Sequence, residues 1–179
     1  MDWNTIVTVR PGPQHEHELL GALARFGRFR PTHFPDVCVG QVSEIGAFLE
    51  ALRTGLEAHA RWTAHIGRVI PADAVFPFTS ETLTDRLKQA VAPLVARMTE
   101  GSFCVRLERR GLAGKVRTQE IEAVVGDHVN RLAGSQGTRL RIKLDDPDFV
   151  IAAETLGQEC GISLLPRASR QRYPFLRTR

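Results

Sequence analysis

The 179-residue sequence has only three cysteines, Cys38, Cys104 and Cys160, and none of them belongs to a CxxC pair. An odd number of widely spaced cysteines argues against a disulfide framework and against a zinc ribbon. We expect each one to pack as a small reduced hydrophobic residue. No apolar run approaches the roughly 18–20 residues of a membrane span, and the first residues lack the features of a signal peptide. The sequence therefore predicts a cytoplasmic protein.

Short motifs of catalysis and cofactor binding are missing as well. The segment 111–116 is not a P-loop, because its glycines are too close together and no Ser or Thr follows Lys115. No GxGxxG motif follows a predicted strand, and no GxSxG motif is present. The histidines of segment 15–18 are two residues apart, whereas a zincin helix needs them four apart. These absences predict a protein with no catalytic residue, no metal and no cofactor, and hence not an enzyme.

Positive charge is concentrated in the second half of the chain. Residues 1–100 hold 10 Lys and Arg against 11 Asp and Glu, whereas residues 101–179 hold 14 against 9. A basic half beside a nearly neutral half is the coarse electrostatic pattern of a protein that binds a polyanion. Arginine supplies most of this charge and suits phosphate contacts and base stacking. A solvated surface in an arginine-rich proteome is the alternative interpretation.

Residues 1–100 predict a small domain in which strands and helices alternate. Two helices with apolar stripes would pack on one face of a small sheet. Pro93 lies inside the last helix and should kink or split it. The expected elements are a strand at 5–9, a helix at 14–26, a strand within 32–42, a helix from residue 43 to about 56, a strand at 65–69 and a helix from residue 80.

Residues 101–179 predict a second α/β domain that ends in a basic tail. A strand at 102–108 alternates, with Phe103, Val105 and Leu107 on one face. A helix is expected at 118–132. A strand at 139–144 should turn Leu140, Ile142 and Leu144 inward and its cations outward. Further strands are expected at 149–153 and 161–165. The whole chain is thus predicted to be an α+β protein of two domains, 1–100 and 101–179.

Four segments of the second domain resemble the THUMP domain, an RNA-binding module of tRNA-modifying proteins. The resemblance rests on the order and spacing of the four segments, and it runs from about residue 100 to about 165. At Lys143 the sequence departs from the family, which often has an acidic residue there. The segments are 103–111, with Arg-Arg-Gly after a strand, 118–126, 144–151, with a Pro-Asp turn, and 160–164.

Two more segments resemble one branch of the family, the stand-alone THUMP proteins that assist tRNA cytidine acetyltransferase. They are Arg-Val-Ile-Pro at 68–71 and Arg-Tyr-Pro-Phe-Leu at 172–176. The resemblance implies a ferredoxin-like domain at 1–100 before the THUMP domain. It also implies tRNA or another structured RNA as a partner, and a modifying enzyme such as the acetyltransferase as a second partner.

Three groups of cations are candidate RNA contacts. In the first group, glycines let the loop backbone approach a phosphate closely. In the second, cations share one strand face, where they could follow an RNA backbone or simply protect a sheet edge. In the third, cations alternate with aromatics, which could stack on bases or dock the tail on the protein. The groups are Arg106, Arg109, Arg110 and Lys115; Arg139, Arg141 and Lys143; and Arg167, Arg170 and Arg172 with Tyr173 and Phe175.

The sequence therefore predicts a non-catalytic module or adaptor that binds RNA in tRNA modification. Asp145, Asp146 and Asp148 do not fit a calcium loop and are predicted to form a turn. Two alternatives stay open. The chain could be an RNA-modifying enzyme with an unrecognised cofactor site, which cofactor binding would reveal. It could also be a protein-interaction adaptor that no longer binds RNA, which would copurify with a partner but not with RNA.

Overall fold

The computed structural model describes residues 2–111, 114 and 116–178, and it divides them into two compact units. The first unit comprises residues 2–72 and 169–177, and the second comprises residues 73–168 and Thr178. The boundary predicted near residue 100 differs from this division. The helix after residue 80 packs in the second unit, and most of the basic tail packs in the first.

The first unit contains a four-stranded antiparallel sheet with strand order β2-β3-β1-β4. Its elements follow one another as β-α-β-β-α-β, and both α-helices contribute to one hydrophobic core with the sheet. They are β1 (Thr5–Val9), α1 (His15–Leu23), β2 (Gly27–Pro31), β3 (Val37–Val42), α2 (Ile45–Glu57), the 3-10 helix η1 (Arg61–His65) and β4 (Ile66–Pro71).

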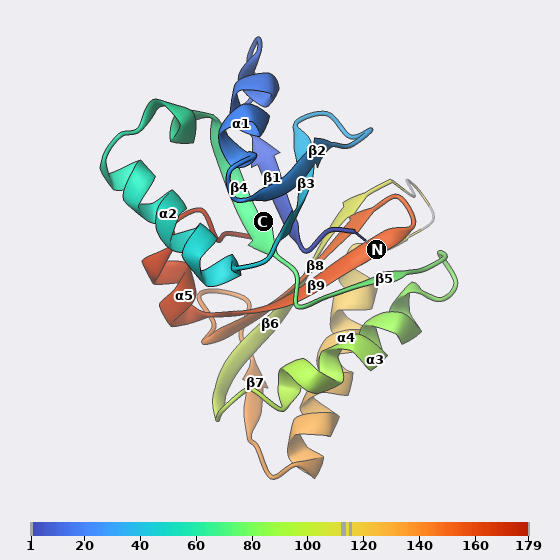
Figure 1. Cartoon of the computed structure of the whole chain (residues 1–179). Helices are drawn as coiled ribbons and strands as arrows, with labels where there is room; N and C mark the ends of the chain where they lie inside the picture. The colour runs from blue at the N-terminus through green and yellow to red at the C-terminus, as the bar shows by residue number, and fades with distance from the viewer. Residues whose placement is uncertain (1, 112–113, 115, 179) are drawn as a thin grey trace. The chain divides into compact units, whose positions relative to one another are not determined.

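The second unit contains a five-stranded mixed sheet with strand order β5-β9-β8-β6-β7 (Figure 1). Strand β6 lies parallel to both of its neighbours, whereas β9 lies antiparallel to β8 and β5. Its elements are β5 (Ala74–Pro77), α3 (Leu83–Val95), β6 (Gly101–Arg110), α4 (Thr118–Ser135), β7 (Leu140–Ile142), β8 (Phe149–Leu156) and β9 (Glu159–Pro166), after which α5 (Arg167–Arg172) leads into the tail.

Helices α3 and α4 pack against each other and share one core with the sheet of the second unit (Figure 1). The predicted alternation of β6 is confirmed, because Phe103, Val105 and Leu107 all belong to this core and are nearly inaccessible. On α4, residues Val125 and Val129 lie four apart and therefore on one helix face, which they bury in the same core. Each such side chain contributes roughly 1.5–3 kcal/mol when fully buried.

Two strands that the sequence did not predict are β2 and β5. Strand β2 reads Gly-Arg-Phe-Arg-Pro and lies at an edge of its sheet, with both arginines exposed. Strand β5 has only four residues and pairs with β9 across more than eighty residues of sequence. Neither has the run of β-branched residues that predicts a strand, because each is held in the sheet by its partner strand rather than by its own propensity.

The prediction for residues 139–144 is wrong in part. Strand β7 covers only Leu140–Ile142, and the side chains that should face inward do not all do so. Ile142 is 46% exposed and Leu144 is 64% exposed. The strand ends early because the chain turns through Asp146, whose φ is 37°, and Pro147. Leu144 therefore lies beyond the end of the sheet.

Candidate functional site

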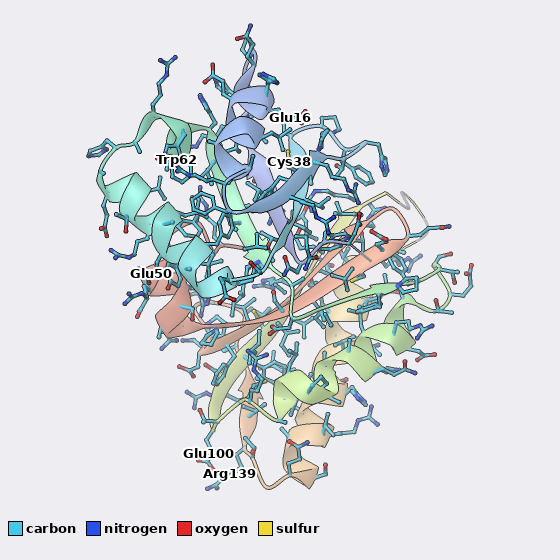
Figure 2. The ribbon with its side chains drawn as sticks, in the orientation of Figure 1. Glu16, Cys38, Glu50, Trp62, Glu100 and Arg139 are labelled. Carbon is cyan, nitrogen blue, oxygen red and sulfur yellow. The ribbon has the colours of Figure 1, made fainter. Side chains whose placement is uncertain are left out.

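Three of the predicted cations surround the short edge strand β7. Arg139, Arg141 and Lys143 are all exposed. The side chain of Arg139 is 88% exposed, and its Nε lies 3.4 Å from an oxygen of Glu100, which is itself 64% exposed (Figure 2). The Nζ of Lys143 donates to the backbone carbonyl of Asp146 at 3.2 Å. An exposed, loosely paired ion contributes little to stability, so these cations keep most of their charge available to a ligand.

The cations in and after β6 are placed differently. Arg106 is half-buried, and its Nη2 donates to the carbonyl oxygen of Leu144 at 2.6 Å. Arg109 is also half-buried, and its Nη1 lies 3.4 Å from the carbonyl oxygen of Gly111. Lys115 lies outside the described residues. Among the described members of this group, Arg106 and Arg109 are thus less exposed than Arg139, Arg141 and Lys143.

Arg110 forms an ion pair with Glu154 on the neighbouring strand β8. The side chain of Glu154 is only 2% exposed and that of Arg110 is 13% exposed. A carboxylate at this depth needs a cation and hydrogen bonds to offset its loss of hydration. Arg110 supplies that partner inside the protein, which assigns it a structural role rather than the predicted phosphate contact.

Arg167 is held at the turn between β7 and β8. Its guanidinium lies 3.3 Å from a carboxylate oxygen of Asp146 and 3.1 Å from one of Asp148. The carboxylate of Asp148 also accepts hydrogen bonds from the backbone N–H and hydroxyl of Ser102, which lower the pKa of Asp148. The aspartates of this turn thus fasten the start of β6 to the start of β8, in agreement with the predicted turn.

The basic tail docks on the first unit through its aromatic residues. Phe175 is buried, and its carbonyl oxygen accepts a hydrogen bond from Val69 of β4 at 3.0 Å. Arg172 and Tyr173 both donate to Glu50 of α2 at 2.6 Å, and these bonds lower the pKa of Glu50 to about 2. The structure thus shows the aromatics docking the tail on the protein, which is one of the two predicted roles. Arg170 is half-buried in α5.

Glu122 has a role that the sequence did not reveal. Sequence reasoning gave it only a favourable place near the N-terminus of its helix. In the structure its carboxylate accepts a hydrogen bond at 2.7 Å from the backbone N–H of Leu107, on the edge of β6 that β7 leaves uncovered. No local signal identifies this contact, because it depends on where β7 ends.

The described residues show no arrangement that identifies a metal centre or a reactive thiol. Within residues 2–111, 114 and 116–178, no three His, Cys, Asp or Glu side chains come together in a way that could hold a metal ion. All three cysteines are free and buried, as predicted, and burial raises the pKa of the Cys38 thiol to about 12. Of the helices described, none combines the length and apolar character needed to cross a membrane.

A mixed five-stranded sheet with two helices on one face places the second unit among small α/β domains. The chain belongs to the THUMP family, because the family model described as "THUMP domain" matches residues 76–165, half of the chain. This match begins earlier than the predicted resemblance, which started near residue 100. It includes the last two residues of β5 and the whole of α3, which the structure also assigns to the second unit.

Several solved structures share the fold over almost the whole chain. TrmN from Thermus thermophilus has a TM-score of 0.62 at 19% identity, over 93% of this chain and 47% of that one. A 4-thiouridine synthetase in complex with RNA and bound ATP has a TM-score of 0.60 at 12% identity, over 92% of this chain and 41% of that one. SMU.472, a candidate methyltransferase complexed with SAH, has a TM-score of 0.54 at 10% identity, with the same two coverages.

These similarities establish the shared fold, and the chain spans less than half the length of the three proteins. A comparison with curated protein sequences gave no match.

The prediction that this protein is not an enzyme is contradicted by these structures. A synthetase and a candidate methyltransferase contain the same fold, as one part of a larger chain. The sequence argument relied on the absence of nucleotide- and cofactor-binding motifs from 179 residues. This fold also occurs in longer proteins that are named as enzymes. The absence of such motifs from these 179 residues therefore does not exclude an enzyme.

The structural role of Arg110 can be tested by a double substitution. Arg110→Met leaves the Glu154 carboxylate buried without this guanidinium, so we expect the free energy of unfolding to fall by about 3–5 kcal/mol. Adding Glu154→Leu removes the buried charge and should restore most of the loss. Urea unfolding measures both effects. Arg141→Met, at an exposed cation, is the control and should change stability by less than about 0.5 kcal/mol. Equal effects of Arg110→Met and Arg141→Met would contradict the assignment.

Proposed function

We propose that this protein binds RNA, and tRNA in particular, through Arg139, Arg141 and Lys143, which we call the β7 cations. The single observation that carries the proposal is their exposure around the edge strand β7, where Arg139 is only loosely paired with the exposed Glu100 at 3.4 Å. Other predicted cations, among them Arg110, Arg167 and Arg172, are closely paired with carboxylates of the protein itself. The β7 cations are therefore the ones best placed to neutralise phosphates.

The comparisons support RNA as the polyanion. The chain is a THUMP protein, and its fold resembles that of a 4-thiouridine synthetase that was solved in complex with RNA. Three exposed cations around a short edge strand present charge to an extended polyanion. Such a surface follows a phosphate backbone and recognises its shape, as proteins that bind structured RNA commonly do. We propose that this binding serves tRNA modification.

The salt dependence of tRNA binding tests the proposal. In Arg139→Glu with Arg141→Glu, we expect tRNA affinity to fall by at least about tenfold, and the dependence of log affinity on log salt to become less steep by nearly two, because two phosphate contacts are lost. Fluorescence anisotropy over a salt series measures both quantities. Duplex DNA of similar length should bind more weakly than tRNA to the unaltered protein.

The matched control reverses two cations on α3 of the same unit, Arg86→Glu with Lys88→Glu. This double variant makes the same change in net charge and should leave the steepness of the salt dependence within about 0.5 of the unaltered protein, because it loses no phosphate contact. Equal losses of tRNA affinity in the two double variants would mean that the affinity depends on net charge alone. That result, or equal binding of tRNA and DNA, would overturn the proposed site.

We also infer that the first unit is a ferredoxin-like domain and that the protein presents tRNA to a modifying enzyme, with a cytidine acetyltransferase as the first candidate. The β-α-β-β-α-β order and the strand order β2-β3-β1-β4 support the ferredoxin-like assignment. The acetyltransferase rests on the segments 68–71 and 172–176. These two segments lie together in the first unit, where Val69 donates a hydrogen bond to Phe175. Part of the resemblance in these segments therefore reflects their packing against each other.

The acetyltransferase assignment predicts a specific chemical defect in cells. Deleting the gene should abolish acetylated cytidine in bulk tRNA, and a plasmid copy should restore it. Mass spectrometry of tRNA nucleosides measures the loss, and other modified nucleosides serve as internal controls. Unchanged acetylcytidine, or tRNA that contains none in the parent strain, would contradict the assignment of an acetyltransferase as the partner. Neither result bears on the proposal that the protein binds tRNA, which the salt series tests separately.

A further inference from the structure

Strand β6 is covered on one edge for only part of its length. Strand β7 pairs with Gly101, Ser102 and Phe103, and the N–H of Lys143 then donates to the carbonyl oxygen of Phe103 at 2.9 Å. Beyond this bond the chain turns away through residues 144–148, whereas β6 continues to Arg110. The part of this edge around Val105 therefore faces the space beside α4.

The backbone groups on this edge follow from the alternation of a strand. The carbonyl of Phe103 and the N–H of Leu107 both point to the edge, toward Lys143 and Glu122 respectively. Val105 lies midway between them, so its N–H and C=O point the same way. In the part of the chain that the structure describes, Val105 has no hydrogen-bond partner on this side. Such unpaired groups are a template for an added strand.

A groove of about 430 Å³ runs along this edge. One wall is α4, whose lining residues recur every three or four positions and so form one stripe along the helix. The small residues Ala123 and Gly126 make room in this wall; a Cβ on Gly126 would come within 3.5 Å of Ile142 Cδ1. The groove is lined by Phe103, Cys104, Val105 and Arg106 of β6, by Gln119, Glu122, Ala123, Gly126 and Asp127 of α4, and by Ile142 and Leu144.

The groove exposes both apolar and acidic side chains. Ile142 and Leu144 are two of the three large hydrophobic residues exposed on the described surface. Glu122 and Asp127 bring two carboxylates to the α4 wall, and Asp127 is exposed. The cation in the lining, Arg106, already donates to the carbonyl oxygen of Leu144. The groove is therefore apolar at one end and acidic along one wall.

We propose that this groove binds an extended segment of a protein partner, which adds as a strand beside β6. The backbone of the segment pairs with Val105. One of its carbonyl oxygens replaces the Glu122 carboxylate as the acceptor of the hydrogen bond from the N–H of Leu107. Every second side chain of the segment then enters the groove, since side chains alternate along a strand. Apolar side chains cover Ile142 and Leu144, and basic side chains meet Glu122 and Asp127. Main-chain bonds supply affinity and the groove supplies selectivity, as in other complexes formed by strand addition.

The chemistry of the groove favours a polypeptide over RNA. Phosphates would meet the carboxylates of Glu122 and Asp127 at a wall where the guanidinium of Arg106 is already engaged. The alternation of β7 also separates the two surfaces. Ile142 points toward α4, and Arg141, the neighbouring residue, points to the opposite face of the strand. The proposed partner surface thus differs from the β7 cations and does not depend on RNA binding.

Selection of peptides on the full-length protein tests the proposal. The probe is a phage library of random octapeptides, and selected peptides are synthesised and titrated by fluorescence anisotropy. We expect enrichment of sequences that alternate and combine apolar with basic residues. Leu144→Asp and Asp127→Lys should each weaken these peptides by at least about tenfold, equivalent to 1.4 kcal/mol or more. Asp85→Lys, the same charge change at an exposed position of α3, should leave their affinity unchanged.

Nuclear magnetic resonance locates the bound peptide and distinguishes the two kinds of ligand. Selected peptides should shift the amide resonances of Val105 and Leu107, whereas a single-stranded hexacytidine RNA should not. Thermal unfolding of each variant verifies that it is folded, and either substitution suffices if the other does not fold. The proposal is overturned if no selected peptide depends on these positions, or if the RNA rather than the peptide shifts the two amides.

Discussion

The second unit depends on the unequal pairing of β6 with its two parallel neighbours. Strand β8 pairs with β6 over eight residues, from Phe103 to Arg110, whereas β7 pairs over only three. The long pairing aligns Phe103, Val105 and Leu107 over one core with α3 and α4. The short pairing leaves the edge at Val105 open beside α4 and holds a cluster of cations at the rim of the sheet. One register therefore fixes the core, the groove and the proposed RNA surface.

Much of this unit could be predicted from local sequence patterns. The alternating segment at 102–108 and the apolar stripe of 118–132 indicated the central strand and its covering helix, because both patterns reflect burial against one core. Strands β2 and β5 could not be predicted in the same way. The two arginines of β2 and the four residues of β5 acquire strand structure from partners distant in sequence. Missing β5 also displaced the predicted domain boundary by nearly thirty residues.

The candidate site shows a similar division between local and distant information. The sequence identified clusters of cations, but it could not tell which cations already have a carboxylate partner. Arg110 pairs with Glu154, 44 positions away, and Arg172 with Glu50, 122 positions away. Such pairs depend on strand register and on the return of the tail to α2. Our proposal therefore centres on the predicted contacts around β7, where charge remains exposed.

The two proposed surfaces lie on one small unit but differ in chemistry. The β7 cations present exposed positive charge, which suits a phosphate backbone. The groove presents open backbone groups, apolar side chains and carboxylates, which suit an extended polypeptide. A protein with both surfaces could hold an RNA and a partner protein at the same time. The solved structures that share this fold contain it within longer chains.

The central claim is that tRNA contacts the protein at the β7 cations, and covalent labelling of side chains tests it most directly. The protein is treated with phenylglyoxal for arginine and an acetylating reagent for lysine, with and without saturating tRNA, and labelling is read by mass spectrometry. Bound tRNA should protect Arg139, Arg141 and Lys143 strongly, while Arg86 and Lys88 of α3 keep their labelling rates. Equal protection at both places, or no protection of the β7 cations while tRNA is bound, would contradict the account.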